Sequence, residues 1–345
     1  MATGYVYDPI YLEHDLRGHP ENRQRLEIIL RTLTQYHLLE RLTPISAVPI
    51  SRERLERAHD SHYIDLVKRV SDQGGGHLDM DTYVRPASYQ AGLLAAGGLV
   101  EATRAVLDGQ VANAFALVRP PGHHAIRGRG MGFCLFNNVA IAARYALAER
   151  GLERVLIVDF DVHHGNGSQD EFEADPAVLY LSTHQYPYYP GTGYWNETGQ
   201  GAGAGTVVNV PLTGAAGDQG FARILHEIVN PVAWRFQPQL ILVSAGYDAH
   251  WDDPLASMLL SVTGYAAIAR ALKELAGELC NGRLVFTLEG GYHLDALAYS
   301  VLNTFAILLG DDQWQVVDPL GPSPRNERPV DEIIARVQQV HGLRS

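Results

Sequence analysis

The chain has 345 residues, of which 46% are hydrophobic and 19% are charged, a composition typical of a globular protein with a large buried core. Its formal net charge of −12 argues against the basic face that nucleic-acid binding requires, so we expect no nucleic-acid partner. An acidic surface either favours cationic substrates or only keeps the protein in solution, and the second interpretation is the simpler one.

Short apolar runs alternate with longer segments of helical spacing along most of the chain. In chain order we expect a strand at 5–7, helices at 26–38, 61–71 and 87–107, a strand at 115–118, a helix at 138–150, strands at 155–158, 178–181 and 207–210, a helix at 219–236, a strand at 240–243, a helix at 263–279, a strand at 284–287, and helices at 295–309 and 330–341. Strands that alternate with helices of more than ten residues predict an α/β protein with a parallel sheet and helices on both faces. No repeat or linker divides the chain, so we expect a single domain over residues 1–345.

The strand at 155–158 leads into a cluster of ionisable side chains. Asp159, Asp161, His163 and His164 follow it directly. Buried carboxylates and imidazoles persist only if they are paired, hydrogen-bonded or bound to a metal. In extended geometry Asp161 and His163 point to the same side, which makes half of a zinc site. A buried Asp–His hydrogen-bond network without metal is the alternative that this stretch alone leaves open.

The other core strands also lead into polar residues. Ligands of parallel α/β sheets bind outside the carboxyl ends of the strands, so these residues should meet at one edge. The segments that follow the five strands are 119–125, 159–167, 182–184, 244–250 and 288–292. Any one of these segments could be structural, but together their carboxylates, imidazoles and glycines favour a catalytic metal centre.

A third metal ligand should come from another carboxylate at this edge, and Asp248 fits. Asp161, His163 and Asp248 would leave the fourth position of a zinc ion for water. Because two carboxylates reduce the charge of the ion, its water is less acidic and a separate general base is needed. The tandem His123–His124 offers an acid–base pair, although adjacent histidines in a Pro-Gly turn are usually surface residues.

Tyr292 follows two glycines and could bring its hydroxyl to the oxyanion of a transition state. The loss of one such donor typically costs about 10²–10³ in rate. The alternative is a tyrosine at the rim of the site that only packs on its neighbours.

Five sequence blocks resemble, in the same order, those of the histone deacetylase superfamily. They are Arg-Pro-Pro-Gly-His-His-Ala at 119–125, Asp-Phe-Asp-Val-His-His-Gly-Asn-Gly at 159–167, Tyr-Pro-Gly-Thr-Gly at 189–193, Ala-Gly-Tyr-Asp at 245–248 and Glu-Gly-Gly-Tyr at 289–292. In detail they are most similar to class II deacetylases and to bacterial histone deacetylase-like and acetylpolyamine amidohydrolases. The resemblance implies a three-layer α/β/α, arginase-like fold with an eight-stranded, mostly parallel sheet. It also implies zinc-dependent hydrolysis of an acetylamide at the end of a narrow tunnel.

The resemblance further implies roles for single residues. The implied zinc ligands are Asp161, His163 and Asp248. His124 would be the general base, and His123 would polarise the water and the leaving group. Asp159 would orient His123, Asn166 would orient His124, and Tyr292 would polarise the acetyl carbonyl. The implied substrate-binding residues are Gly132, Phe133, Tyr189, Gly291 and the rim acid Asp81. A potassium ion is expected near Asp159, Asp161, His163 and Ser182.

Two residues separate the branches of this superfamily. Asn166 stands where class I members have an aspartate, and class II members share the asparagine. A neutral amide orients an imidazole without raising its pKa as a carboxylate would. Some vertebrate class II members replace the tyrosine at the position of Tyr292 by histidine and lose most activity on acetyl-lysine, so the tyrosine predicts a working deacetylase.

We therefore expect a zinc amidohydrolase that acts on an acetylated amine, either acetyl-lysine in proteins or an acetylpolyamine. The first alternative is an arginase-like binuclear manganese hydrolase, for which His164 and Asp252 are the extra candidate ligands. The second alternative is a non-catalytic module that binds acyl-lysine. The residues leave open which substrate is physiological and whether the chain forms a homo-oligomer.

The remaining expectations concern the compartment. Cys134 and Cys280 are too few for a disulfide framework or a Cys-rich zinc cage. The first nine residues lack a basic region followed by an apolar run, and no stretch of 18 apolar residues predicts a membrane span. We expect a cytoplasmic protein with no membrane partner.

Overall fold

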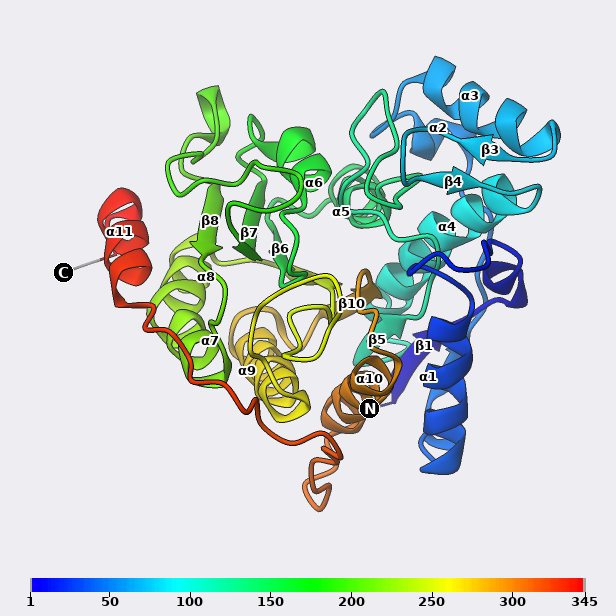
Figure 1. Cartoon of the computed structure of the whole chain (residues 1–345). Helices are drawn as coiled ribbons and strands as arrows, with labels where there is room; N and C mark the ends of the chain where they lie inside the picture. The colour runs from blue at the N-terminus through cyan, green and yellow to red at the C-terminus, as the bar shows by residue number, and fades with distance from the viewer. Residues whose placement is uncertain (1, 344–345) are drawn as a thin grey trace.

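The computed structural model describes residues 2–343. At its centre lies an eight-stranded sheet in the order β2-β1-β5-β10-β9-β6-β7-β8, and every neighbouring pair is parallel (Figure 1). The strands are β1 Thr3–Val6, β2 Thr43–Ile45, β5 Asn113–Ala116, β6 Val155–Asp159, β7 Val178–Gln185, β8 Val207–Leu212, β9 Leu240–Ala245 and β10 Leu284–Leu288. The predicted eight-stranded parallel sheet is therefore confirmed.

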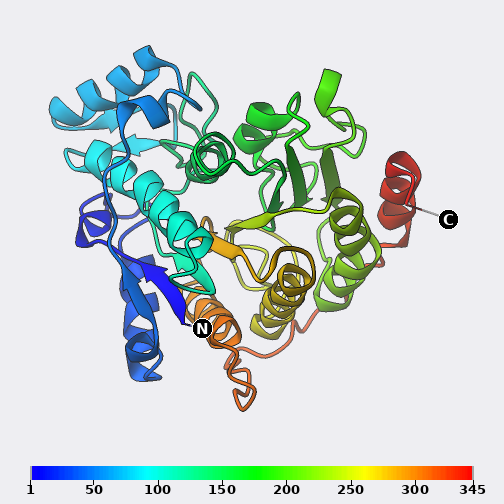
Figure 2. The same cartoon turned by 180° about the vertical axis from the view of Figure 1, so that it is seen from behind.

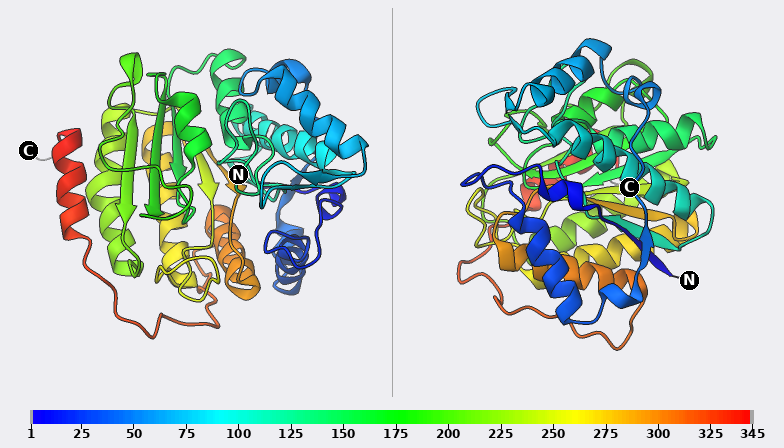
Figure 3. Two further views of the ribbon diagram at one scale, coloured as in Figure 1. Left: turned by 45° about the horizontal axis from the view of Figure 1, so that its top comes forward. Right: turned by 90° about the vertical axis from the view of Figure 1, so that its right-hand side faces the viewer.

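Helices cover both faces of this sheet. On one face α10 packs between α1 and α9, and α9 also contacts α7; on the other face α4 packs on α5 (Figure 2, with α4 in cyan). α11 lies beside β8 at the end of the sheet (Figure 3, left, in red). The helices are α1 Gln24–Gln35, α2 Arg52–Leu55, α3 Ser61–Asp72, α4 Ser88–Leu107, α5 Asn138–Ala148, α6 Asn166–Phe172, α7 Asp218–Ile224, α8 Asn230–Phe236, α9 Val262–Cys280, α10 Leu294–Leu309 and α11 Asp331–His341, with short 3₁₀ turns at Pro9–Leu12, Leu39–Arg41 and Gly201–Gly203.

Some predicted boundaries are wrong. β5 begins two residues before the apolar run at 115–118, because Asn113 already pairs with Thr3 and Leu284 in the ladder. The side chain of Asn113 donates to the Leu308 carbonyl at 3.1 Å, so this polar residue is accommodated in the strand. The single helix predicted at 219–236 is divided by a π-helical turn at Leu225–Val229. Pro231 has no amide hydrogen to donate to an earlier carbonyl, which accounts for a local change in the helical ladder there.

Several elements have no counterpart among the predicted ones. β2, α2 and α6 are absent from the prediction. The segment 77–85, predicted as a loop, contains β4 Tyr83–Val84 and one residue of its antiparallel partner β3 Gly76–His77. Within residues 2–343, no helix combines the length and the apolarity that a membrane span needs.

The order of the strands determines where the polar loops meet. β5, β10, β9, β6 and β7 are consecutive neighbours, so their carboxyl ends form one continuous edge. All five residues of β6 and all five of β10 are buried, which keeps the sheet rigid beneath that edge. The loops after these strands carry the predicted site residues.

Candidate active site

Three of the predicted metal ligands come together at the ends of β6 and β9. The Nδ1 atom of His163 lies 3.2 Å from Asp161 Oδ1 and 3.2 Å from Asp248 Oδ2. The ligand atoms of the three residues all lie within 4.8 Å of one another. Both carboxylates are fully buried, whereas the His163 side chain keeps 12% exposure toward the pocket. Asp248 thus lies close enough to Asp161 and His163 for the three residues to share one metal ion.

The hydrogen bonds of these carboxylates leave one oxygen free. Asp161 Oδ2 accepts from the Gly290 amide at 2.8 Å, and Asp248 Oδ1 accepts from the Val162 amide at 3.0 Å. Asp248 Oδ2 is buried and accepts no hydrogen bond of good geometry. A buried carboxylate oxygen without a donor is costly unless a cation satisfies it. One imidazole nitrogen and two carboxylate oxygens are a donor set that suits zinc.

The charges at this point also require a cation. Burial alone would lower the pKa of His163, but the carboxylates of Asp161 and Asp248 beside its ring raise it to about 10. Burial raises the pKa of Asp248, and the negative charge of Asp161 adds to that effect. Two buried carboxylates thus repel each other unless a proton or a metal ion lies between them. The residues present fit a divalent metal ion.

The tandem histidines point into the protein and not toward solvent. Their side chains are both 3% exposed, and their rings lie 4.0 Å apart between centroids. His123 Nδ1 lies 3.0 Å from Asp159 Oδ2, and His124 Nδ1 donates to Asn166 Oδ1 at 2.9 Å. Each ring is therefore held through Nδ1, which leaves Nε2 to face the pocket.

The two histidines differ in charge. Burial would lower the pKa of His123, but the carboxylates of Asp159 and Asp161 outweigh burial and raise it to about 10. Burial lowers the pKa of His124 well below its usual value, and the neighbouring His123 and His163 lower it further. A carboxylate behind one ring and an amide behind the other produce a cationic and a neutral imidazole side by side.

A pocket of about 300 Å³ opens onto these residues. It is lined by Asp81, Pro121, His123, His124, Gly132, Phe133, His163, Tyr188, Tyr189, Leu255, Gly290 and Tyr292. The rings of Phe133 and Tyr292 meet edge to face at 5.9 Å, and Tyr189 meets His124 edge to face at 5.0 Å. Aromatic walls around a small polar end suit a slender substrate with an apolar stem.

Gly132 brings the backbone close to the base of the pocket. Its φ is +55°, and a Cβ atom there would lie 2.4 Å from His124 Cδ2. Phe133 also has a positive φ, of 70°, and its amide donates to Thr82 Oγ1 at 3.2 Å. The strained turn therefore places the Phe133 ring in the wall, while Gly132 leaves room for His124.

Tyr292 is held through its backbone. Its amide donates to Asp253 Oδ2 at 2.7 Å, and the Arg25 guanidinium lies 5.1 Å from its ring centroid. Gly291, which precedes Tyr292, is not among the lining residues; its carbonyl accepts from Arg25 Nε at 2.7 Å. Gly290 lines the pocket in its place. Asp81 also lines the pocket.

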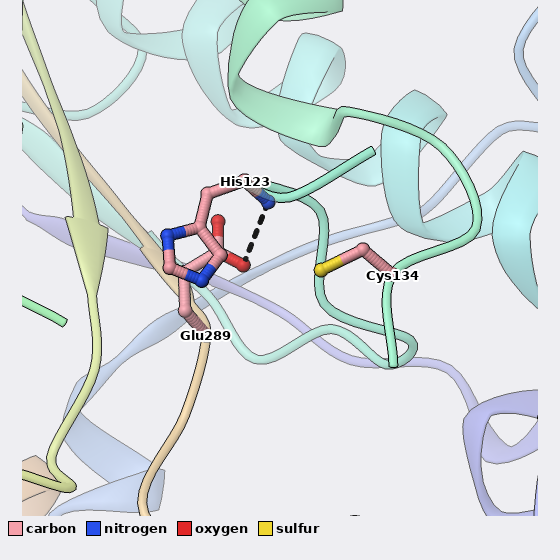
Figure 4. A group of neighbouring side chains, drawn as sticks. All are labelled: His123, Cys134 and Glu289. Carbon is pink, nitrogen blue, oxygen red and sulfur yellow. Dashed lines mark hydrogen bonds between the residues drawn. The ribbon is translucent and has the colours of Figure 1, made fainter. Parts of the chain in front are cut away.

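Glu289 supports the tandem histidines, a role that the sequence analysis does not assign. Its Oε2 accepts from the amides of Gly122 at 2.7 Å and His123 at 3.3 Å, the second of which is drawn in Figure 4. Its Oε1 accepts from Ser244 Oγ at 3.1 Å. Glu289 is fully buried and directly follows β10. The sequence shows an acid after an apolar strand at this position, but it does not show which groups the acid binds.

Cys134 lies near Glu289 and His123, so these three side chains form a second buried group of potential ligands. Both Glu289 oxygens and His123 Nδ1 already have hydrogen-bond partners. Burial also raises the pKa of the Cys134 thiol well above its usual value, which disfavours the thiolate that a metal needs. We interpret this group as structural.

The two extra ligands considered for a second metal point elsewhere. His164 is bonded to Thr192 Oγ1 at 2.8 Å and to Gln169 Oε1 at 3.0 Å. Asp252 lies 3.3 Å from His293 and is half exposed. Among the described residues, the first ligand group therefore contains no additional carboxylate or imidazole that would complete a binuclear site.

Ser182 and His184 lie inside β7 and not after it, because this strand continues to Gln185. Ser182 pairs with Asp159 in the ladder, and its hydroxyl is 2.9 Å from His184 Nδ1. The structure thus brings Ser182 next to Asp159, two of the four residues near which a potassium site was expected.

Comparisons with known proteins identify relatives of the whole chain. The histone deacetylase domain family matches residues 19–308. A "Probable deacetylase" of Archaeoglobus fulgidus is 42% identical over 323 residues, which cover 92% of this chain and 89% of that protein. "Polyamine deacetylase HDAC10" of Homo sapiens is 40% identical over 316 residues, which cover 88% of this chain and 46% of that protein. The crystal structure of the "HDA15 HD domain" superposes with a TM-score of 0.90 at 36% identity, covering 99% of this chain and 95% of that one.

Proposed function

Because this chain belongs to the histone deacetylase family, we propose that it is a zinc-dependent amidohydrolase that removes acetyl, or a similar short acyl group, from a primary amine. The family membership inferred from the five sequence blocks is confirmed, and it makes the chain a hydrolase of the deacetylase type. The observation that carries the proposal is the buried group Asp161, His163 and Asp248 at the end of a pocket that also presents His123, His124 and Tyr292.

Asp161, His163 and Asp248 would hold the zinc ion. When bound, such an ion acts as a Lewis acid that polarises the acyl oxygen and acidifies water. The unpaired Asp248 Oδ2 and the mutual repulsion of the two carboxylates support this assignment.

The chain's own residues would supply the proton transfers. His124 presents Nε2 to the pocket because Asn166 holds its Nδ1, so it would accept the proton of the attacking water. His123, held through Nδ1 by Asp159, would donate a proton to the leaving amine. The Tyr292 hydroxyl would donate a hydrogen bond to the oxyanion that develops from the acyl carbonyl.

The walls of the pocket favour a substrate with an extended apolar stem. The rings of Phe133 and Tyr189 would flank the methylene chain of an acetylated amine, with Gly132 beside them. Acetyl-lysine in a protein and an acetylpolyamine both have such a stem, and one relative is called a polyamine deacetylase. Gly291 would contribute to substrate binding through its backbone, and Asp81 would do so from the rim of the pocket.

One accessory proposal concerns the surroundings of the site. Potassium would bind near Asp159 and Ser182, where two adjacent strands bring a carboxylate and a hydroxyl together. A cytoplasmic location and the lack of a nucleic-acid partner stay predictions, and a homo-oligomeric state stays an open alternative.

The decisive test compares Tyr292→Phe and His124→Ala with the wild type on an acetyl-lysine reporter peptide, with zinc content measured in each. Both variants should retain zinc and lose turnover by at least about 10²-fold, since each lacks a group that acts only on the reaction. Near-wild-type rates in either variant would refute the role assigned to that residue. Two manganese ions per chain would revive the arginase-like alternative.

A further inference from the structure

A second cavity lies at the end of the sheet, where the β7–β8 loop meets the C-terminal segment. Its volume is about 450 Å³, larger than the catalytic pocket. One wall is the loop after β7, with Tyr186, Tyr194 and Trp195; the opposite wall is α11, which lies beside β8 (Figure 1). Cavities of this size lie within the usual range for small-molecule sites.

Backbone hydrogen bonds hold the walls together. The Tyr186 amide donates to the Leu212 carbonyl at 2.8 Å, which joins the loop to the end of β8. The Arg328 amide donates to the Ala215 carbonyl at 2.8 Å, which joins the C-terminal segment to the same region. The carboxylate of Glu197 accepts from the amides of Gly193 and Tyr194. These hydrogen bonds fix the loop and the C-terminal segment on either side of the cavity.

Aromatic side chains line one part of the cavity. The rings of Tyr186 and Tyr194 lie 5.1 Å apart between centroids, and those of Tyr194 and Trp195 lie 5.2 Å apart. Leu212 and the buried Val330 add apolar surface. A planar apolar group can pack on such rings.

Two arginines line another part of the cavity. Arg328 and Arg336 both line the cavity, and neither lies within 4.0 Å of a carboxylate in the part of the chain that the structure describes. The Arg336 guanidinium stacks 4.9 Å from the Trp195 ring centroid. A guanidinium held over a ring keeps its in-plane N–H groups available for a carboxylate.

The nearby acids Glu327 and Asp331 do not pair with these two arginines. Glu327 accepts from the amides of Gln219 and Gly220, and Asp331 pairs with Arg223 at 2.7 Å. Glu332 is the single acid among the lining residues. The cavity therefore carries more positive than negative charge, in a protein whose formal net charge is −12. An anion would therefore gain favourable electrostatic energy from binding in this cavity.

We propose that this cavity is a second binding site, which takes a small molecule that joins a planar aromatic group to a carboxylate. The ring packs against Tyr194 and Trp195, and the carboxylate binds Arg336 and Arg328. The site is separate from the catalytic pocket, although the loop that forms its wall also carries Tyr188 and Tyr189 of that pocket. The proposal does not depend on the reaction catalysed.

The test uses 2-naphthoate as the probe and its neutral amide, 2-naphthamide, as the matched ligand. Binding is measured by calorimetry on the full chain, with a saturating hydroxamate present so that the catalytic pocket does not contribute. We expect the amide to bind about tenfold more weakly or worse, as the loss of charge-assisted hydrogen bonds requires.

Two variants and a control locate the site. Arg336→Met and Arg328→Met keep the aliphatic stem, and each should weaken naphthoate binding about tenfold. Arg31→Met, at an exposed arginine on α1, is the control and should leave the affinity unchanged. Thermal melting shows whether each variant is folded. The proposal is overturned if naphthoate does not bind, if it binds no better than the amide, or if both cavity variants bind it as the wild type does.

Discussion

Replacing Glu289 by leucine removes the acceptor that holds the turn before His124. In the wild type, Oε2 accepts from the Gly122 and His123 amides at 2.7 and 3.3 Å, and Oε1 contacts Ser244 Oγ at 3.1 Å. Burial raises the pKa of Glu289 to about 7. At pH 6 the side chain is thus mostly protonated, and glutamine is its close analogue: the amide oxygen accepts from the two backbone groups and the NH₂ donates to Ser244.

The magnitude follows from the orphaned donors. A buried polar group that loses its partner costs about 1–3 kcal/mol. Leucine leaves two backbone N–H groups unpaired, so we expect Glu289→Leu to lower the free energy of unfolding by about 2–6 kcal/mol at pH 6. Glu289→Gln should stay within about 1 kcal/mol of the wild type because its hydrogen bonds can all form.

Urea denaturation at pH 6, followed by tryptophan fluorescence, measures both free energies. Turnover of an acetyl-lysine reporter should fall in the leucine variant as well, since the displaced turn carries His123 and His124. If Glu289→Leu is as stable as Glu289→Gln, then the carboxyl group does not hold this turn, and the reasoning is wrong.

Two further outcomes can be measured independently. Burial lowers the pKa of His59 to about 4, and its Nε2 accepts from the Asn137 amide at 2.9 Å, so its neutral form stabilises the fold. This contribution is complete above pH 6.5 and falls as the pH drops to 4, by about 1.4 kcal/mol per pH unit and about 3 kcal/mol in all. Because burial lowers the pKa values of His184 and His250 to about 4 as well, the quantity to measure is the difference in unfolding free energy between the wild type and His59→Leu, which should fall by this amount over that range. Gly132→Ala places a Cβ atom 2.4 Å from His124 Cδ2 at a φ of +55°, so turnover should drop by at least about 10²-fold, whereas Gly128→Ala, whose Cβ meets its nearest neighbour at 3.4 Å, should keep wild-type turnover. Equal activity of the two alanine variants would show that His124 does not need the space that Gly132 leaves beside its ring.

The fold and the ligand group follow from patterns that a single chain displays. Hydrophobic runs of strand length alternate with helices, and acids or histidines stand directly after the runs, which was enough to expect Asp161, His163 and Asp248 at one edge. Short elements gave weaker signals. β2 has three residues and includes a proline, and the β3–β4 pair has two residues per strand, so neither has a periodicity to recognise.

Side-chain partnerships are the part that the sequence could not provide. Whether His123 and His124 point inward depends on Glu289, which is 165 residues or more away along the chain and accepts from their turn. The catalytic pocket includes Leu255 and Tyr188, which have no distinctive local pattern. The π turn before Pro231 was not predicted because the helical spacing of apolar residues continues across it, although the proline itself is a local signal for a change in the helix.

Metal content per chain tests the central claim most directly. Elemental analysis of the purified wild type should give one zinc ion per chain, and Asp248→Ala should lose it, because this carboxylate supplies the buried oxygen that no hydrogen bond satisfies. His164→Ala, on the far side of the same loop, should retain the zinc. Two metal ions in the wild type, or full zinc occupancy in Asp248→Ala, would contradict the assignment of Asp161, His163 and Asp248 as the ligands of a single catalytic ion.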